Sequence, residues 1–139
     1  MMRILPMVLA IMALPVWADP AAVSAVNGLR AAKGRAAVVY DPVLERAAAA
    51  HAQDMARHDY FSHQGKNGSS VGQRISAQGY KWCFAAENIA KGQKSLAAVM
   101  QSWAGSQGHY QNIMHRKVRG FGLARAEGNV WVMVLAAPC

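Results

Sequence analysis

The stretch Val130-Trp131-Val132-Met133-Val134-Leu135 decides the fold. It is β-prone and places six apolar residues in succession, without the alternation of polar and apolar residues that a half-exposed strand shows. A strand that is apolar on both faces must be covered on both faces. We therefore predict an interior strand whose sheet has a layer of helices on each side.

Two further segments are predicted to join this strand in the sheet. Val118 to Ala124 is also β-prone, and Glu127-Gly128-Asn129 is a turn sequence that would connect the two as a hairpin. Tyr80 to Ile89 is the third strand-like segment. Together with helices from both halves of the chain, this pattern predicts an α/β fold, a three-layer α/β/α sandwich with a small, mainly antiparallel sheet.

The helices are predicted from their capping signals. Asp19 and Asp41 each place a capping side chain before a proline at the first helical position. Ser70 with Gln73 forms a capping box, and Ser95 precedes an apolar stripe. The predicted helices run from Pro20 to Gly34, from Pro42 to about Arg57, from Val71 to Gln78, and from Ser95 through Trp103, and Tyr110 to His115 is also helix-like.

The first eighteen residues are predicted to be a secretory signal peptide, with an uncleaved membrane anchor as the alternative. A short positive start at Met1-Met2-Arg3 precedes an apolar run from Ile4 to Val16, and Val16-Trp17-Ala18 offers small residues for cleavage. Cleavage after Ala18 would leave residues 19–139 as a single domain, secreted or periplasmic. No other apolar stretch reaches the roughly 20 residues of a membrane span, so we expect a soluble protein with no stable membrane span.

Export also bears on the cysteines and on the surface charge. In an oxidising compartment, the even pair Cys83 and Cys139 favours one disulfide, with two unpaired thiols as the alternative.

Without Arg3, 14 of the 15 basic residues remain against 7 acidic ones, a formal charge of +7. These cations are scattered and do not alternate with aromatic residues, so we expect no nucleic-acid partner. The basic surface would meet anionic cell wall or lipid head groups, or would simply be solvated.

Three residues in compact polar signatures are the candidate functional groups. They are His63 after Tyr60-Phe61-Ser62, Glu87 before Asn88, and His109 after Gly108. Imidazole and carboxylate groups bind divalent metals and transfer protons. Because a buried Glu87 would need a partner, and a histidine is the natural one, we predict that the three converge on one partly accessible cleft. The alternative for each histidine is structural hydrogen bonding, and the alternative for Glu87 is a structural ion pair.

Two other polar residues are interpreted structurally. His51 lies on the apolar face of the second helix and is expected to be a core histidine. Gly68-Ser69-Ser70-Val71-Gly72 matches the G-x-S-x-G pattern of a hydrolase nucleophile, but a polar loop precedes it where that motif requires a strand. Ser70 is therefore interpreted as a helix cap.

These segments, taken in order, resemble the CAP superfamily of cysteine-rich secretory, antigen-five and pathogenesis-related-one proteins, and in particular its short bacterial members. The resemblance covers Val23 to Leu135 and implies an α/β/α sandwich, the SCP domain. The segments that carry it are Asn27-Gly28-Leu29-Arg30, Ala50 to Ala56, Tyr60-Phe61-Ser62-His63, Arg74 with Gly79-Tyr80, Glu87-Asn88-Ile89, Trp103, and Gly108-His109-Tyr110-Gln111-Asn112.

The resemblance implies a site of two histidines and two glutamates, of which this chain has three. His63, Glu87 and His109 match, whereas Ser106 stands where the second glutamate is expected. Serine is a poor metal ligand. We therefore expect a protein that requires no cofactor, with at most a weak zinc site formed by His63, Glu87 and His109.

Three functions remain open at this point. The first is a binding module that holds a small ligand, a lipid or an anionic cell-envelope component in a cleft formed by His63, Glu87, Asn88, Ser106 and His109. The second is a peptidase-like extracytoplasmic hydrolase with a histidine as base and Glu87 orienting it. The third is an interaction protein with a purely structural cleft. Hydrolysis also needs a nucleophile or an activated water and an oxyanion donor set, so we expect binding rather than catalysis.

Overall fold

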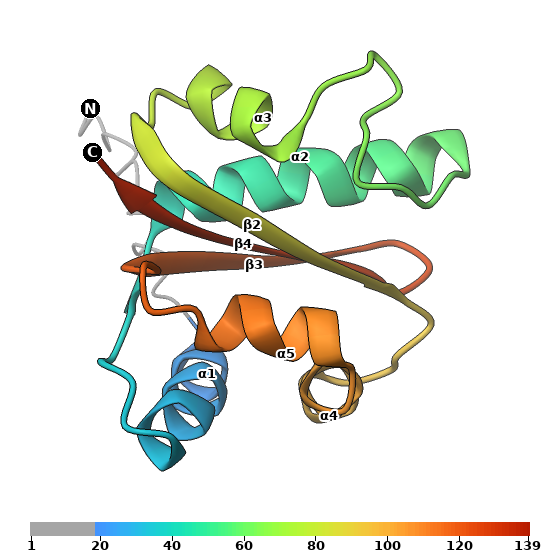
Figure 1. Cartoon of the computed structure of the whole chain (residues 1–139). Coiled ribbons are helices and arrows are strands. Elements are labelled where there is room, and N and C mark those ends of the chain that lie inside the picture. The colour runs from blue at the N-terminus through green and yellow to red at the C-terminus, as the bar shows by residue number, and fades with distance from the viewer. Residues whose placement is uncertain (1–18) are drawn as a thin grey trace, which may run out of the picture.

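A four-stranded sheet lies between two layers of helices in the computed structural model, which describes residues 19–139 (Figure 1). The predicted signal peptide, residues 1–18, lies outside the described residues. The predicted three-layer α/β/α architecture is confirmed. In chain order the elements are α1 (Pro20–Ala32), β1 (Val39–Tyr40), α2 (Pro42–His58), α3 (Val71–Ala77), β2 (Trp82–Lys91), α4 (Leu96–Ala104), α5 (Gln107–Met114), β3 (Gly120–Ala126) and β4 (Val130–Pro138).

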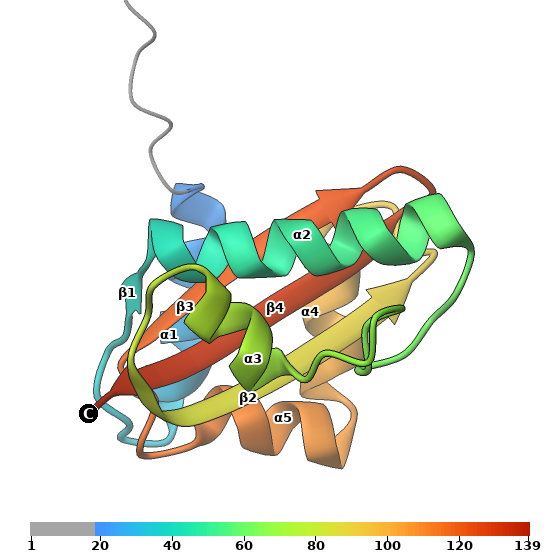
Figure 2. The same ribbon diagram turned by 90° about the horizontal axis from the view of Figure 1, so that it is seen from above.

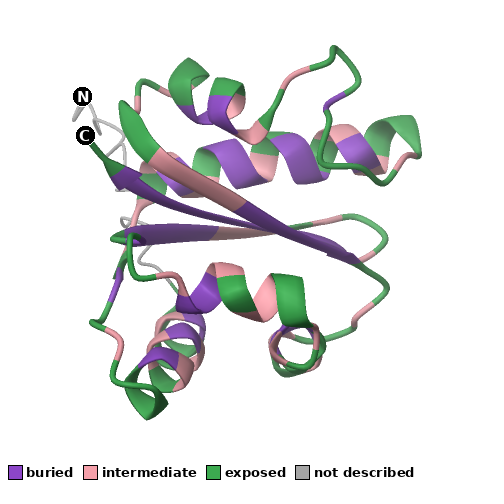
Figure 3. Ribbon diagram, viewed as in Figure 1, coloured by how far each residue is buried: buried purple, intermediate pink, exposed green. Residues whose placement is uncertain are grey.

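The predicted interior strand, β4, lies in the middle of the sheet. The strand order is β1-β3-β4-β2, and β4 pairs antiparallel with both β2 and β3. All residues of β4 from Val130 to Ala137 are buried, and the strand is purple throughout that stretch in Figure 3. Its full burial explains why its sequence shows no alternation of polar and apolar residues.

The side chains of β4 divide between two hydrophobic clusters. Val132 and Val134 pack with residues of α2 and α3, which lie over one face of the sheet (Figure 2). Trp131, Met133 and Leu135 pack with residues of α1, α4 and α5 on the other face. Alternate residues of one strand thus hold together the two outer layers.

The helix starts follow the predicted caps. The side chains of Asp19, Asp41 and Ser95 each accept a hydrogen bond from a backbone N–H of the first turn, at 3.0, 2.8 and 3.1 Å. Ser70 and Gln73 form the predicted capping box of α3. Since Ser70 follows a loop and caps a helix, it does not occupy a nucleophile elbow.

Several element ends differ from those expected. The first helix ends at Ala32, before Gly34, and the second continues one residue beyond Arg57. A fifth helix, α5, begins at Gln107 and contains His109. The two-residue β1 was not predicted; it pairs in parallel with the start of β3, a contact between segments about 80 residues apart.

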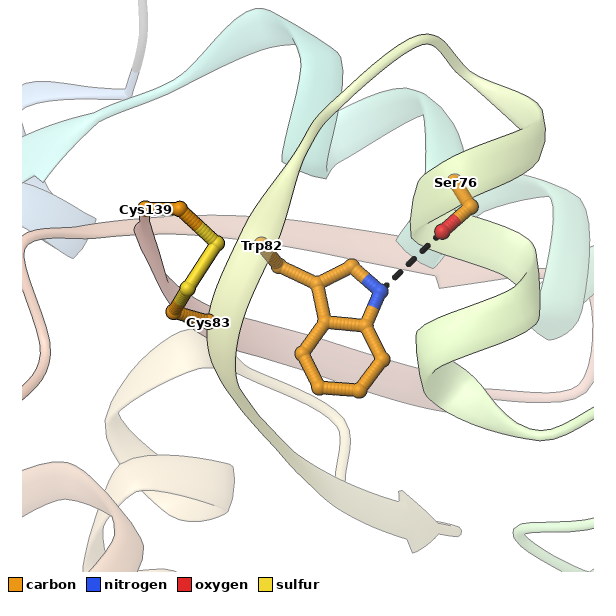
Figure 4. The surroundings of a disulfide bond; sticks show 4 residues. All are labelled: Ser76, Trp82, Cys83 and Cys139. Atoms are coloured by element: carbon orange, nitrogen blue, oxygen red, sulfur yellow. Dashed lines mark hydrogen bonds between the residues drawn. A yellow bond between two sulfur atoms is a disulfide. The ribbon is translucent and has the colours of Figure 1, made fainter.

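The chain end is attached to the start of β2. Cys83 and Cys139 form the predicted disulfide, with Cα atoms 4.8 Å apart. Figure 4 shows this disulfide on one side of β2 and the Trp82 indole on the other, where it donates hydrogen bonds to Ser76 and to the carbonyl oxygen of Gly72. None of the helices in residues 19–139 is long and apolar enough to cross a membrane.

Candidate functional site

The site is organised around the carboxylate of Glu87 in β2. Glu87 faces α2 and α3, and its side chain is only 2% exposed. His63 Nδ1 donates to Oε1 and Arg74 Nη2 donates to Oε2, each at 2.9 Å. His51 Nε2 lies 3.9 Å from Oε1. A buried carboxylate is costly unless it is paired and hydrogen-bonded, and here each oxygen has a direct partner.

His63 presents its ring to solvent from the loop that follows α2. Its side chain is 61% exposed, although Nδ1 is bound to the buried Glu87. That hydrogen bond raises the pKa of His63, against a smaller opposing effect of burial. Because Nδ1 faces the carboxylate, Nε2 is the nitrogen left to meet solvent or a ligand. The ring is therefore both accessible and fixed in orientation.

Arg74, on α3, connects this loop to the sheet. In addition to Glu87, it donates to the carbonyl oxygens of His63 at 2.9 Å and of Ser69 at 2.7 Å. Sequence reasoning named Arg74 only as part of the family resemblance and gave it no role. The sequence did place the Glu87 carboxylate in an apolar strand, where it would need a cationic partner. It did not show which cation would reach this carboxylate.

His51 is buried in α2, as predicted, and also borders the site. Its Nε2 donates to the carbonyl oxygen of Ser62 at 2.7 Å. Burial is the main cause that lowers the pKa of His51, and the charge of Glu87 opposes it. Its Nδ1 is buried and has no hydrogen-bond partner among residues 19–139. His51 therefore supports the loop that carries His63, a role that its position on an apolar helix face did not reveal.

His109 approaches from the other helical layer. It lies on α5, with Nδ1 2.9 Å from the hydroxyl of Ser106, which occupies the N-cap position of this helix without forming a side-chain capping hydrogen bond. The Asn88 side chain donates to the carbonyl oxygen of His109 at 3.0 Å and accepts from Asn112 at 2.9 Å. Adjacent residues of a strand point to opposite faces, so Glu87 holds His63 on one face while Asn88 holds α5 on the other.

The structure therefore joins His63 directly to Glu87 and couples His109 to them less closely. Burial, and after it the positive charge of His63, lowers the pKa of His109. Within residues 19–139, no hydrogen bond connects the His109 ring to His63 or Glu87. His63 lies on one side of β2, an edge strand of the sheet, and His109 lies on the other side.

The three side chains do not fit the weak zinc site that the sequence suggested. In the described part of the chain, no group of three or more histidine, cysteine, aspartate or glutamate side chains is placed to hold a metal ion. The physical reason lies in the bonding of Glu87, whose two oxygens are engaged by His63 and Arg74. Three ligands around one ion would require these contacts to break.

A hollow of about 450 Å³ lies beside the site, between α2 and the loop before α3. His51 and Arg74 contribute to its wall, together with the polar side chains of Asp54, His58 and Lys66. His63, Glu87 and His109 are not among its lining residues. The exposed imidazole of His63 thus lies on the surface, outside this hollow.

Fold and site together define the class of protein. Residues 23–135 match the CAP family, described as the cysteine-rich secretory protein family. The chain therefore belongs to the CAP family, as the resemblance in its sequence implied.

Two proteins of Bacillus subtilis (strain 168) are similar in sequence. Protein YkwD is 34% identical over 106 residues, which cover 76% of this chain and 41% of YkwD. The membrane protein YlbC is 28% identical over 97 residues, which cover 70% of this chain and 28% of YlbC. The chain thus spans less than half the length of either relative.

Solved structures agree with the fold. An extracellular protein containing an SCP domain from Bacillus anthracis str. Ames superposes with a TM-score of 0.80 at 23% identity, over 84% of this chain and 39% of that one. An outer surface protein from Borrelia burgdorferi also gives a TM-score of 0.80, at 19% identity, over 86% of this chain and 92% of that one. At these identities the likeness establishes the α/β/α fold.

Proposed function

We propose that this chain is exported and works outside the cytoplasm as a CAP-domain binding module whose ligand contacts His63. Export is supported by the signal-peptide pattern of residues 1–18 and by structural neighbours described as extracellular and outer-surface proteins. The observation that carries the binding function is the His63–Glu87 pair. It combines a 61% exposed imidazole with a carboxylate that is 2% exposed.

The bonding of His63 favours an acidic or strongly hydrogen-bond-accepting ligand. Glu87 stabilises the protonated imidazole, so Nε2–H is a donor that points away from the carboxylate. The ligand would be a small anion, a lipid head group or an anionic component of the cell envelope. In the proposed site His109, on α5, would contribute a second ring nitrogen. Such a site requires neither a metal nor a nucleophile.

The binding test compares two histidine variants. Lysophosphatidylglycerol and soluble peptidoglycan fragments would be titrated against the wild-type protein, with glucose as an uncharged comparison, and followed by NMR chemical shifts. We expect saturable shifts at His63 and His109 with an acidic probe and their loss in His63→Ala. His58→Ala removes another partly exposed histidine and should bind as the wild type does. Equal binding by His63→Ala and wild type would refute the proposal.

Export has its own test. Expression of the full chain in a bacterial host, followed by cell fractionation and N-terminal sequencing, should yield an extracytoplasmic protein that begins at Asp19. Retention of residues 1–18 on the exported protein would contradict cleavage. A wholly cytoplasmic product would contradict export while leaving the binding surface to be tested as above.

A second candidate function, hydrolysis, is favoured by one contact. Ser106 Oγ and His109 Nδ1 lie 2.9 Å apart, the separation of a nucleophile and its base. Burial and the charge of His63 lower the pKa of His109, which keeps its ring neutral and able to accept a proton. In a catalytic triad a third group orients the base, and the carboxylate of Glu87 is bound to His63 instead. Binding therefore remains the first proposal.

Labelling with a fluorophosphonate distinguishes the two functions. If Ser106 is a reactive nucleophile, the probe should form a covalent adduct on it that mass spectrometry locates, and Ser106→Ala should abolish that adduct. Ser70→Ala removes the serine of the G-x-S-x-G match and serves as the control. We expect no adduct on either residue if the chain only binds its ligand.

A further inference from the structure

Two loops that are distant in the sequence lie side by side where α1 and α5 end. The link from α1 to β1, residues 33–38, runs beside the link from α5 to β3, residues 115–119, in both Figure 1 and Figure 2. Arg35 Nε joins the two segments by donating to the carbonyl oxygen of Met114, the last residue of α5, at 3.0 Å. Neither loop contains His63 or His109, so this end of the molecule is separate from the site described above.

Positive charge gathers at this junction. Five side chains of the two loops form what we call the cationic patch, four of them exposed and that of Arg35 half-buried: Lys33, Arg35, Arg116, Lys117 and Arg119. With Arg30 they make up 6 of the 14 basic residues that follow residue 18. Residues 30–38 and 113–119 contain no aspartate or glutamate, and none of the six cations forms a salt bridge within residues 19–139. Cations that are scattered along the sequence are thus brought together by the fold.

Arg30 adds a charge beneath the patch. It is completely buried, and its guanidinium donates to the carbonyl oxygens of Ala36 at 2.8 Å, Ile113 at 2.8 Å and His115 at 3.0 Å. These neutral acceptors satisfy hydrogen bonds but do not balance the charge. Burial lowers the pKa of Arg30, and the positive charges of Arg35 and Arg119 lower it further. The fields of these cations therefore add at this end of the molecule, where they attract anions.

The fold accounts for only some of these charges. Arg30 and Arg35 bond carbonyl oxygens at the end of α5, a role typical of basic residues at a helix C-terminus. Arg119 donates to the carbonyl oxygens of two residues in its own loop. The side chains of Lys33, Arg116 and Lys117 form no hydrogen bond or ion pair within the described part of the chain. These three charges are therefore available to an external anion.

The arrangement of the patch favours a polymer over a small anion. An exposed ion pair contributes little by itself, so a ligand with one charge would be held weakly. A linear chain with repeated negative charges pairs with several cations at once, and each later pair forms at a high effective concentration. A nucleic acid would also bring bases, which bind by stacking on aromatic side chains. At this end of the molecule the rings of Phe84 and His115 already stack on each other, with centroids 4.2 Å apart.

We propose that the cationic patch binds an anionic polysaccharide, whose successive acidic groups pair with Lys33, Arg116 and Lys117. The charges of Arg30, Arg35 and Arg119 strengthen the attraction. The choice of a polysaccharide rests on the export part of the proposed function, because such polymers belong to the cell envelope. The binding itself needs no contact with His63.

The test uses dextran sulfate as the probe and uncharged dextran of equal length as its control, with binding followed by isothermal titration calorimetry and NMR chemical shifts. We expect dextran sulfate alone to bind, with the largest shifts at Lys33, Arg116 and Lys117. Raising the salt from about 50 mM to about 500 mM should weaken binding severalfold, because salt screens exposed charges. Equal binding of dextran, or the absence of dextran sulfate binding at low salt, would overturn the proposal.

Two triple variants separate the patch from net charge. Lys33→Gln/Arg116→Gln/Lys117→Gln should weaken binding about tenfold, since three exposed charge pairs each contribute a few-fold. Arg46→Gln/Arg57→Gln/Lys94→Gln makes the same change of charge at exposed positions outside the patch and should bind nearly as the wild type does. The charge-preserving variant Lys33→Arg/Arg116→Lys/Lys117→Arg should retain binding. Equal weakening by the two glutamine variants would show that net charge alone is responsible and would overturn the patch.

Three further comparisons test the partner. His63→Ala should bind dextran sulfate as the wild type does, so a failure of the proposed His63 site leaves this result intact. A single-stranded oligothymidylate should bind no more tightly than dextran sulfate, because no ring at the patch is open to base stacking. Tighter binding of the oligonucleotide, or binding confined to phosphatidylglycerol vesicles, would point to a different partner and would overturn the inference.

Discussion

Glu87 shows how one residue connects the sheet to the surface. It lies in a strand whose neighbouring positions Ile89 and Ala90 belong to the hydrophobic core, yet its carboxylate is ionically paired. Removing one partner of a buried pair costs more free energy than the pair itself contributes, because a charge is left without compensation. The stability of this region therefore depends on Arg74 as well as on apolar packing.

Replacing Arg74 by glutamine should destabilise the protein by about 3 kcal/mol, the usual cost of breaking a buried ion pair. The free energy of unfolding would be measured by urea denaturation near neutral pH. Arg46→Gln, on α2 and outside the site, is the matched control and should change stability by less than about 0.5 kcal/mol. The double variant Arg74→Gln/Glu87→Gln should recover part of the loss, and an additive loss would contradict the pairing.

The His63–Glu87 bond should make stability depend on pH with a defined sign. The folded-state pKa of His63 is raised, so its contribution is fully present below the unfolded-state value of about 6.5. It is lost as pH rises through the raised folded-state pKa. His63→Gln should therefore cost more stability at about pH 5.5 than at about pH 9. Exposure of the ring keeps the difference modest. A cost that grows with rising pH would show that the pKa is shifted the other way.

For the individual residues, the sequence identified the candidate functional groups more successfully than it identified their bonding partners. The contexts of His63, Glu87 and His109 marked them as candidates, and the need for a partner to Glu87 followed from its apolar neighbours. The contribution of Arg74 depends on how α3 lies on the sheet, and that of His51 on the path of the loop before His63. Such contacts arise from tertiary packing, which local sequence patterns do not reveal.

Among the elements, α2 and β3 approach each other unusually closely. A Cβ atom added at Gly122 would lie 2.1 Å from the backbone nitrogen of Glu45 and 2.4 Å from the carbonyl carbon of Leu44. The absence of a side chain at Gly122 thus allows the helix to rest directly on the strand. This contact sets the position of α2, the helix that carries His51.

Substituting alanine at Gly122 should destabilise the protein by about 3 kcal/mol, because backbone atoms of α2 cannot move aside as a flexible side chain would. Gly28→Ala is the matched control: this position in α1 has no neighbouring atom within 4 Å of the added Cβ. It should stabilise by about 0.5–1 kcal/mol through helix propensity. Denaturant unfolding of both variants measures the contrast, and equal stabilities would contradict the close approach.

The elements most accurately predicted were those with strong local signals. The uninterrupted apolar run predicted an interior strand, and the cap residues located the helix starts to within a residue. The strand β1 was missed because its two residues carry no periodicity of their own and are defined by pairing with β3. Local sequence signals therefore predicted the helical and sheet layers, whereas the order of the strands in the sheet could be read only from the structure.

For the whole molecule, the disulfide links residues 56 positions apart in the sequence. A cross-link that closes a loop of this length lowers the entropy of the unfolded chain and stabilises the fold by about 4 kcal/mol in the chain-entropy model. It also attaches the end of β4 to the exposed start of β2, where the strand would otherwise fray.

The variant Cys83→Ala/Cys139→Ala should unfold at lower urea concentration than the oxidised wild type, with a loss of about 2–4 kcal/mol. Reduction of the wild type should produce a similar loss, while reducing agent should leave the variant unchanged. Mass spectrometry of the non-reduced wild type should give the mass of the dithiol less two hydrogens. A reducing agent that lowers the stability of both proteins equally would point to a cause other than this bond.

The position of β4 has a consequence for the order in which the protein can form. Ribosomes make β4 after the other three strands, yet it supplies the pairing partner of both β2 and β3. Until β4 emerges, β2 has no neighbour in the sheet, and the two helical layers have no common surface to cover. A nascent chain of this design stays open while it is being synthesised. If the chain is exported as we propose, that open state suits passage through a narrow export channel.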